Sequence, residues 1–409
     1  MKVRWLSEAM LLGILFFVPQ WAFSQQEHVK LDWKPFENRL GIPAMWTPAI
    51  SPEVHKDRTV TFRLVALAAK EVLLSGPVTT PLGKSGEKLS MKKSVDGVWS
   101  ITIGPLPPDM YLYAFEMDGV HLADPNNTFG ILSNQPPYSE VVVHGDGPRY
   151  YDFREVLHGA VTRHIYHSNV VGGPRDLYVY TPPCCGNQER KLCPPHVLEK
   201  MPKRFPVLYL MGGSGEIAGT WFEVGRLQAI MDNLLAEEKI RPMLIVCFNN
   251  QMTHRGLPKS DADWDAHSEM VQKDLLNHVV PFIESRYAVV EAPEGRALAG
   301  LSMGGRHTQY VGFRNLSIFG SLGILSAGDK RGLERDAEIL SDPDINGKMD
   351  YLFVGQGRLE RAERTSAFMK ALDQLGVEYE YAAEGGQAHD FATWRWLMYE
   401  HFLPGLFKQ

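Results

Sequence analysis

The sequence lacks any cluster of positive charge. Its 42 Lys and Arg residues are scattered and are outnumbered by 48 Asp and Glu, which gives a formal net charge of -6. Binding of a phosphate backbone requires a gathered basic surface, so nucleic acid is excluded as an expected partner. Internal repeats and low-complexity tracts are also missing, and 44% of the residues are hydrophobic. That composition predicts a globular protein with packed cores.

Long apolar runs are missing beyond the N-terminus, so no internal segment is expected to cross a bilayer. At the N-terminus, Lys2 and Arg4 precede an apolar stretch over 9–18, and small residues at 22–24 offer a cleavage site. This order is typical of a secretory signal peptide, which we predict over 1–24. The protein is then secreted or periplasmic, with no membrane association after cleavage. A membrane anchor is the alternative, although the stretch is short for a span.

Cysteine is scarce, with four residues in the chain. Cys184, Cys185 and Cys193 crowd one loop, and Cys247 lies in an apolar run that resembles a strand. Their spacing matches no common zinc pattern. Three clustered thiols cannot all pair with one another, so one disulfide within the loop and no disulfide at all both remain open.

The chain length favours two domains, because 409 residues exceed what one hydrophobic core usually organises. Apolar and polar residues alternate over 60–64 and 99–103, which is the period of half-buried strands. A third alternating run, 111–117, ends at Asp118-Gly119, a dipeptide that favours a hairpin turn. Short strands with frequent turn residues predict a small all-β, immunoglobulin-like sandwich over residues 25–140.

After a linker predicted over 141–165, strand signals alternate with helical ones. The strand signals are short apolar runs suited to strands buried on both faces. Strand followed by helix, repeated, predicts a mostly parallel sheet with helices on both sides, which we assign to residues 166–409. The apolar runs lie at 207–210, 244–246, 297–299 and 351–354, and the helical faces at 227–235 and 368–375.

The strongest chemical signal is Gly-Leu-Ser-Met-Gly-Gly at 300–305, which follows an apolar run and precedes a plausible helix. A nucleophilic serine on a sharp strand-to-helix turn needs small neighbours, because other backbone passes close to it. The helix start also supplies N–H groups that can face an oxyanion. The motif predicts an α/β-hydrolase fold with Ser302 as nucleophile and the Met303 N–H as an oxyanion donor.

A serine hydroxyl needs an adjacent base, and three histidines follow Ser302 in the chain. His307 lies directly behind the elbow, and His401 lies in the terminal amphipathic segment. His389 lies in a glycine-rich loop beyond the last predicted strand, at the sheet edge where the elbow opens. We therefore predict His389 as the base; the alternative is that it only caps the helix that follows.

A carboxylate should lie between the serine and the histidine, close after a strand, where it orients the imidazole. Glu360 has this position, just beyond the apolar run at 351–354. Its alternative role is to complement the positive end of a helix that starts there. In that case Asp342, Asp344 or Asp373 would orient the base.

The glycine cluster after an early predicted strand is the expected source of a second oxyanion donor, with Gly213 as first choice. Trp221 and Phe222, just beyond it, are predicted to border an acyl pocket, with the core as the alternative. No metal or other cofactor is predicted. His164 and His167 are spaced so as to reach one ion, but without further ligands we expect a structural role.

The segments that carry these signals resemble the feruloyl and acetyl-xylan esterases of carbohydrate esterase family one, which are related to esterase D. The resemblance covers most of residues 160 to 409. It implies a serine esterase that removes ferulate or acetate from plant cell-wall xylan through an acyl-enzyme. The matching segments are 177–183, 207–215, 221–222, 232–234, 300–305 and 386–391.

The N-terminal segment looks like a carbohydrate-binding module of family forty-eight. The resemblance is carried by 96–99, 104–106 and 111–119. It implies feruloylated or acetylated xylan as partner, with the module binding the glycan or acting as a spacer or as a lip of the active site.

Two residues depart from the family pattern. Met211 stands where a histidine usually buttresses the glycine loop, and Glu360 stands where aspartate is usual. Glutamate serves the same role in other hydrolases of this fold. The departures motivate one alternative, a catalytically inactive polysaccharide-binding protein. A second alternative is an acyltransferase that uses the same residues on a sugar acceptor.

Overall fold

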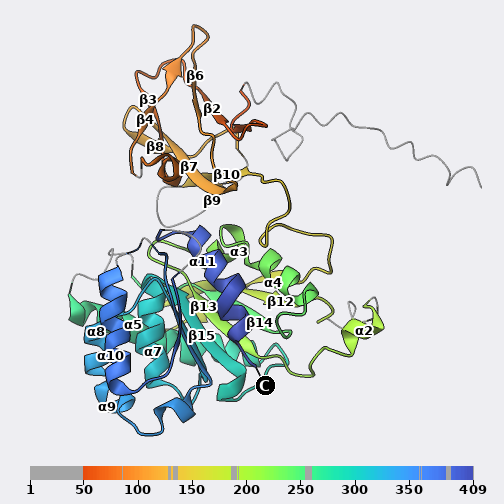
Figure 1. Ribbon diagram of the computed structural model, residues 1–409, viewed down its shortest axis with the longest axis vertical. Helices are drawn as coiled ribbons and strands as arrows, with labels where there is room; N and C mark the ends of the chain where they lie inside the picture. Colours follow the sequence, from red (N-terminus) through yellow and green to blue (C-terminus); the bar gives the residue numbers. More distant parts are fainter. Residues whose placement is uncertain are drawn as a thin grey trace, which may run out of the picture.

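The computed structural model describes residues 49–84, 86–127, 130–131, 137–185, 191, 193–253, 260–358, 360, 362–383 and 388–408. The predicted signal peptide lies outside these residues. Within them, no helix has both the length and the apolar character needed to span a bilayer. The chain forms an N-terminal all-β part and a larger α/β part (Figure 1).

Two antiparallel sheets make up the N-terminal part, and they enclose a core that includes Phe62, Tyr113 and Phe115. The three alternating runs at 60–64, 99–103 and 111–117 lie in strands of these sheets. The first sheet has the order β1 (Glu53–Val54), β2 (Val60–Val65), β6 (Val98–Ile103) and β5 (Lys92–Lys93). The second has the order β4 (Leu89–Ser90), β3 (Val72–Ser75), β7 (Asp109–Met117), β10 (Tyr138–Val143) and β9 (Gly130–Ile131), with β8 (Val120–Leu122) paired to β7.

The hairpin predicted at Asp118-Gly119 is present. Met117 of β7 pairs with Val120 of β8, so two residues form the turn. Asp118 and Gly119 have φ values of 48° and 83°, the positive values that a two-residue turn of this kind requires. Asp118 also accepts hydrogen bonds from the backbone N–H groups of Lys70 and Glu71, which fixes the turn to the neighbouring loop.

The connection between the two parts is shorter than the predicted 141–165. Strand β10 continues to Val143, and β11 of the large sheet already begins at Ala160. The start of β11 carries no apolar run, because it is an edge strand with many exposed side chains. The structure therefore moves the boundaries to 143 and 160.

An eight-stranded mixed sheet forms the centre of the α/β part. The two pairings made by β12 are antiparallel and the other five are parallel, as the buried apolar runs predict. The order is β11 (Ala160–Ser168), β12 (Gly173–Thr181), β14 (Leu244–Phe248), β13 (Val207–Met211), β15 (Arg296–Leu301), β16 (Ser321–Leu325), β17 (Tyr351–Gly355) and β18 (Glu380–Ala382).

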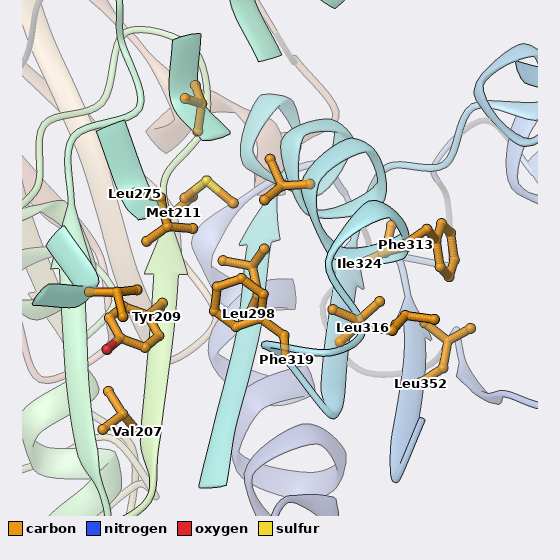
Figure 2. Packing of buried hydrophobic residues seen from close by; sticks show 14 of the residues in the cluster. Val207, Tyr209, Met211, Leu275, Leu298, Phe313, Leu316, Phe319, Ile324 and Leu352 are labelled. Carbon is orange, nitrogen blue, oxygen red and sulfur yellow. The ribbon is translucent and has the colours of Figure 1, made fainter. Parts of the chain in front are cut away.

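Helices cover both faces of this sheet, which explains why the central strands are apolar throughout. In β13, Tyr209 and Met211 face one core (Figure 2), whereas Leu208 and Leu210 face the other. The first core packs against α5 (Asp261–Asp274), α6 (Val280–Glu284), α7 (Met303–Arg314), α8 (Lys330–Arg335), α9 (Ala337–Leu340) and α10 (Ala362–Leu375). The second packs against α3 (Thr220–Glu223), α4 (Leu227–Ala236), α11 (Phe391–Leu397) and α12 (Leu403–Gly405).

Short helical segments complete the described chain. Helix α2 (Pro195–Leu198) lies in the loop after β12. The 3₁₀ segments are η3 (Pro77–Leu82), η5 (Pro293–Gly295) and η6 (Ile345–Lys348), and the π segments are η4 (Leu275–Val279) and η7 (Met398–Phe402).

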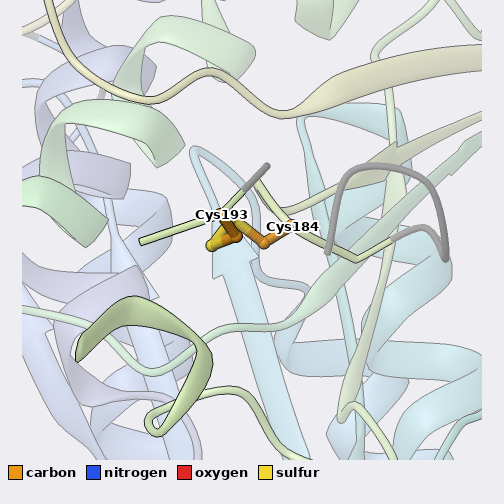
Figure 3. Close-up of a disulfide and its surroundings, with 2 residues drawn as sticks. All are labelled: Cys184 and Cys193. Atoms are coloured by element: carbon orange, nitrogen blue, oxygen red, sulfur yellow. A yellow bond between two sulfur atoms is a disulfide. The ribbon is translucent and has the colours of Figure 1, made fainter. Parts of the chain in front are cut away.

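A disulfide joins Cys184 to Cys193 in that loop (Figure 3), with the two Cα atoms 5.7 Å apart. This resolves the pairing that the sequence left open. Cys247 is buried in β14, and its burial raises the pKa of the thiol well above the usual range. His164 and His167 lie three apart on β11, so they point to opposite faces of the sheet, and the His164 ring lies 2.6 Å from the Tyr287 hydroxyl.

Two ion pairs cross between the sandwich and the α/β part, on the side where α3 and α11 face the sandwich (Figure 1). Arg395 of α11 is 1% exposed and donates to Asp109 of β7 at 2.7 Å. Arg226, just before α4, pairs with Glu140 of β10. The sandwich is thus attached both to α11, the helix that follows His389, and to the N-terminus of α4.

Candidate active site

Ser302 lies on a sharp turn between β15 and α7. Its φ and ψ are 51° and -113°, a strained conformation for a residue with a side chain, and such strain is concentrated at functional sites. The neighbouring glycines are required by close backbone contacts. A Cβ on Gly300 would lie 2.4 Å from the carbonyl carbon of Gly304, and one on Gly304 would lie 2.6 Å from the Gly212 oxygen. The turn is therefore the elbow that the motif predicts.

The structure brings Ser302, His389 and Glu360 together. His389 Nε2 lies 2.9 Å from Ser302 Oγ, across 87 positions of sequence, and His389 Nδ1 lies 3.0 Å from Glu360 Oε2. The imidazole is 49% exposed and the Glu360 carboxylate 10%. The serine and the histidine thus lie at an open surface, with a shielded carboxylate behind them.

Glu360 is held by partners on three sides. Its Oε1 accepts from Ser326 Oγ at 2.5 Å and from the Gly357 N–H at 2.9 Å. Ser326 in turn accepts from Trp394 Nε1 at 2.8 Å, and the indole packs edge-on against His389 at 5.0 Å between ring centroids. These contacts leave Oε2 directed at the imidazole.

Two of the three alternative carboxylates have other partners. Asp342 pairs with Lys348, the Asp342 carboxylate also accepts from the Asp344 N–H, and Asp373 accepts from the Tyr379 hydroxyl at 3.0 Å. The geometry therefore favours Glu360 as the group that orients His389.

The alternative role for His389, capping of the following helix, belongs to its neighbour instead. Asp390 is the N-cap of α11, and its side chain accepts from the Thr393 N–H at 3.0 Å. Of the other two histidines, His307 is fully buried in α7, and burial holds its pKa well below the usual range. His401 packs against Trp396, with 4.8 Å between ring centroids.

In the glycine loop after β13, three consecutive backbone carbonyl groups accept hydrogen bonds from side chains. Each accepts a hydrogen bond from a different side chain, so the peptide planes are fixed without the histidine that Met211 replaces. The pairs are Trp221 Nε1 to Met211 O at 3.1 Å, Asn250 Nδ2 to Gly212 O at 3.0 Å, and Gln251 Nε2 to Gly213 O at 2.8 Å.

The hydrogen bond from Asn250 to the Gly212 carbonyl also determines the direction of the Gly213 N–H. In a trans peptide the N–H points away from the carbonyl, so Asn250 on Gly212 O turns the Gly213 N–H to the opposite side. There it donates to Glu216 Oε2 at 2.8 Å. The N–H that we predict as an oxyanion donor is thus occupied by a carboxylate in this structure. The other predicted donor, Met303, is the first residue of α7.

Trp221 does not line a pocket, contrary to the prediction. It is 1% exposed, packs against Phe391 and uses its only N–H on the glycine loop, so it belongs to the core. Phe222 is partly exposed beside Tyr178, with 6.5 Å between ring centroids. Its predicted contact with substrate stays a prediction.

Four contributors were missed by sequence reasoning: Glu216, Asn250, Gln251 and Ser326. Two of them carried a usable signal. Asn250 and Gln251 follow directly after β14, at the carboxyl edge of parallel strands, where ligand sites gather.

Replacing Asn250 with alanine is expected to lower kcat by roughly tenfold to a hundredfold, because the Gly212–Gly213 peptide loses the partner that fixes its direction. The measurement is steady-state hydrolysis of a soluble ester. Asn346→Ala is the control, since Asn346 also donates to a glycine carbonyl, that of Gly376, but in a different part of the chain. Equal rates for the two variants would contradict the positioning role.

The chain is similar to known proteins in sequence and in fold. The family model described as "Putative esterase" matches residues 191–397. A curated protein from Xylanibacter ruminicola, named endo-1,4-beta-xylanase/feruloyl esterase, is 30% identical over 382 residues. The match covers 92% of this chain but 48% of that protein, so the chain spans about half the length of this relative.

Two solved structures share the fold. A mutant feruloyl esterase module from Clostridium thermocellum, complexed with sinapinate, is 20% identical with a TM-score of 0.51 and covers 63% of this chain and 91% of its own. The enterobactin esterase from Shigella flexneri, in the presence of enterobactin, is 16% identical with a TM-score of 0.57 and covers 87% of this chain and 96% of its own. The family match shows that this chain is a member of the esterase family.

Proposed function

We propose that the chain is a serine carboxylesterase of the α/β-hydrolase fold. The observation that carries the proposal is the hydrogen-bonded series from Ser302 through His389 to Glu360. Ser302 Oγ attacks the ester carbonyl as His389 Nε2 takes its proton, and the protonated imidazole then gives that proton to the leaving alcohol. Water repeats the two steps on the acyl-enzyme, which releases the acid and restores Ser302.

The oxyanion of each tetrahedral intermediate needs N–H donors that are already in place. We assign these to Met303 and, once Glu216 has left it, to Gly213. Glu360 orients His389 and stabilises the imidazolium, and its contacts with Ser326 and Gly357 hold Oε1 so that Oε2 faces the imidazole.

The substrates that we propose are feruloyl esters on plant cell-wall xylan, with acetyl esters as the runner-up. The support is the feruloyl esterase named for the Xylanibacter ruminicola relative, together with the family resemblance of the motifs. A catalytically inactive polysaccharide-binding protein and an acyltransferase are the alternatives. The aligned serine and histidine argue against the first, and only the acceptor distinguishes the second.

We further propose that the protein is exported through the signal peptide at 1–24 and works in the periplasm or outside the cell. We also propose that the sandwich is an immunoglobulin-like domain of the kind found in carbohydrate-binding module family forty-eight. Its two-sheet architecture supports this. Among the described residues of the sandwich, Phe62, Trp99 and Phe115 are buried, and Tyr111 and Tyr138 are partly exposed.

The test compares methyl ferulate and acetylated xylan as substrates, alongside labelling by a fluorophosphonate. We expect turnover of methyl ferulate and covalent labelling of the wild type, and neither in Ser302→Ala. Wild-type protein that takes no label would favour the inactive binding protein. Added sugar that diverts the acyl group from water would favour the acyltransferase.

A further inference from the structure

The Glu216 side chain lies against the glycine loop, on the Gly213 N–H that we assign to the oxyanion hole. Its Oε2 accepts from the Gly213 N–H, and a Cβ on Gly212 would lie 2.6 Å from the same oxygen. A Cβ on Gly213 would lie 2.8 Å from Leu301 Cδ1, in the residue before the nucleophile. A carboxyl group of the protein is thus bound to the N–H that the proposed mechanism assigns to the acyl oxygen.

The charge on Glu216 has little to balance it. In the part of the chain that the structure describes, Glu216 forms no ion pair with lysine or arginine. Burial raises its pKa to about 7, and the Gly213 N–H and the charge of His389 act in the opposite direction. Near neutral pH the group is therefore present both as a carboxylate and as the neutral acid.

The consequence differs between the ester and the product. A neutral ester meets no repulsion from Glu216, and the oxyanion that develops later is accompanied by protonated His389. After the acyl-enzyme is hydrolysed, His389 is neutral again and the product acid loses its proton to water. The product carboxylate then lies beside a second carboxylate, and two like charges at such short range repel strongly.

We propose that Glu216 is a specificity residue that keeps carboxylates out of the acyl site and so speeds release of the acid product. This inference depends on the proposed esterase function. The ligand class that Glu216 rejects is the free carboxylate, and the class that it admits is the neutral acyl derivative of the same shape.

The test uses the full chain with Ser302→Ala, so that binding is measured without turnover. Ferulate and its neutral primary amide are titrated by calorimetry at pH 8, with Glu216→Gln as the variant. Glutamine keeps the length of the side chain and an oxygen that accepts from the Gly213 N–H. We expect the variant to bind ferulate roughly tenfold more tightly or better, and to bind the amide with unchanged affinity.

A second measurement separates charge from structure. Ferulate affinity of the Ser302→Ala protein should weaken as the pH rises through about 7, where Glu216 ionises, and this dependence should be smaller in the Glu216→Gln variant. Equal shifts for ferulate and its amide, or no shift for either, would overturn the inference and leave the esterase proposal standing. If neither ferulate nor its amide binds, and acetate and acetamide do not bind either, the proposed substrates and the inference are overturned together.

Discussion

Replacement of His389 by alanine is expected to lower kcat for ester hydrolysis by roughly 10⁴-fold or more and to leave KM nearly unchanged. The imidazole is the group within 2.9 Å of Ser302 Oγ that can take its proton. Without it the hydroxyl remains a weak nucleophile, and what activity is left comes from the oxyanion donors and from substrate binding. The measurement is the kcat and KM of methyl ferulate hydrolysis, together with the rate of fluorophosphonate labelling.

Two variants serve as controls for the His389 experiment. His401→Ala removes a histidine that packs against Trp396 instead of Ser302, and it should keep near wild-type rates. His389→Ala combined with Ser302→Ala should be no slower than either single variant, because the two groups act as one unit. A His389→Ala protein that labels and turns over like the wild type would remove the basis of the proposed mechanism.

The parts of the site that the sequence predicts are those defined by local pattern and chain order. The glycines around Ser302 report close backbone contacts that any strand-to-helix elbow requires, so the motif carries its own geometry. His389 follows from being the histidine beyond the last strand. Glu360 is predicted as the carboxylate because it comes just after β17. Asp342 and Asp373 are excluded from that role only by the structure, which shows them bound to Lys348 and Tyr379.

The missed residues depend on which loops meet in space. Ser326 reaches Glu360 across 34 positions and Asn250 reaches Gly212 across 38, and neither pair leaves a periodic trace in one sequence. Trp221 is the opposite case, a residue that was predicted to lie in the site and belongs to the core. A large aromatic beside a glycine loop suggests a pocket wall, but its burial and its bond to Met211 O become visible only with the neighbouring helix α11 in place.

The same limit applies at the level of domains. Alternation predicts strands β2, β6 and β7 of the sandwich, because apolar residues in a half-buried strand alternate with polar ones. Strand β11 breaks the rule as an exposed edge, which is why the predicted linker is too long. The contact between Asp109 and Arg395 spans 286 positions, so the attachment of the sandwich beside the active site is a property of the fold alone.

Asp109→Ala is expected to lower the free energy of unfolding by about 3–5 kcal/mol, because it leaves the buried Arg395 guanidinium without its counter-ion. Arg395 would keep the Val224 carbonyl at 2.9 Å and the Tyr151 ring at 4.6 Å, and neither of these carries a full charge. Tyr151 would also lose its own hydrogen bond to Asp109. The measurement is urea unfolding followed by tryptophan fluorescence and by circular dichroism, with proteolysis of the 144–159 connection as a local readout.

The matched control for Asp109→Ala is Glu291→Ala, which breaks an exposed pair with Arg204 in which both side chains are more than half exposed. Exposed pairs contribute about 1 kcal/mol or less, so this control should change little. Asp109→Leu combined with Arg395→Met should recover much of the lost stability, because an apolar pair removes the unbalanced charge. If Asp109→Ala changes stability no more than Glu291→Ala does and leaves the connection resistant to protease, the buried pair does not hold the sandwich in place.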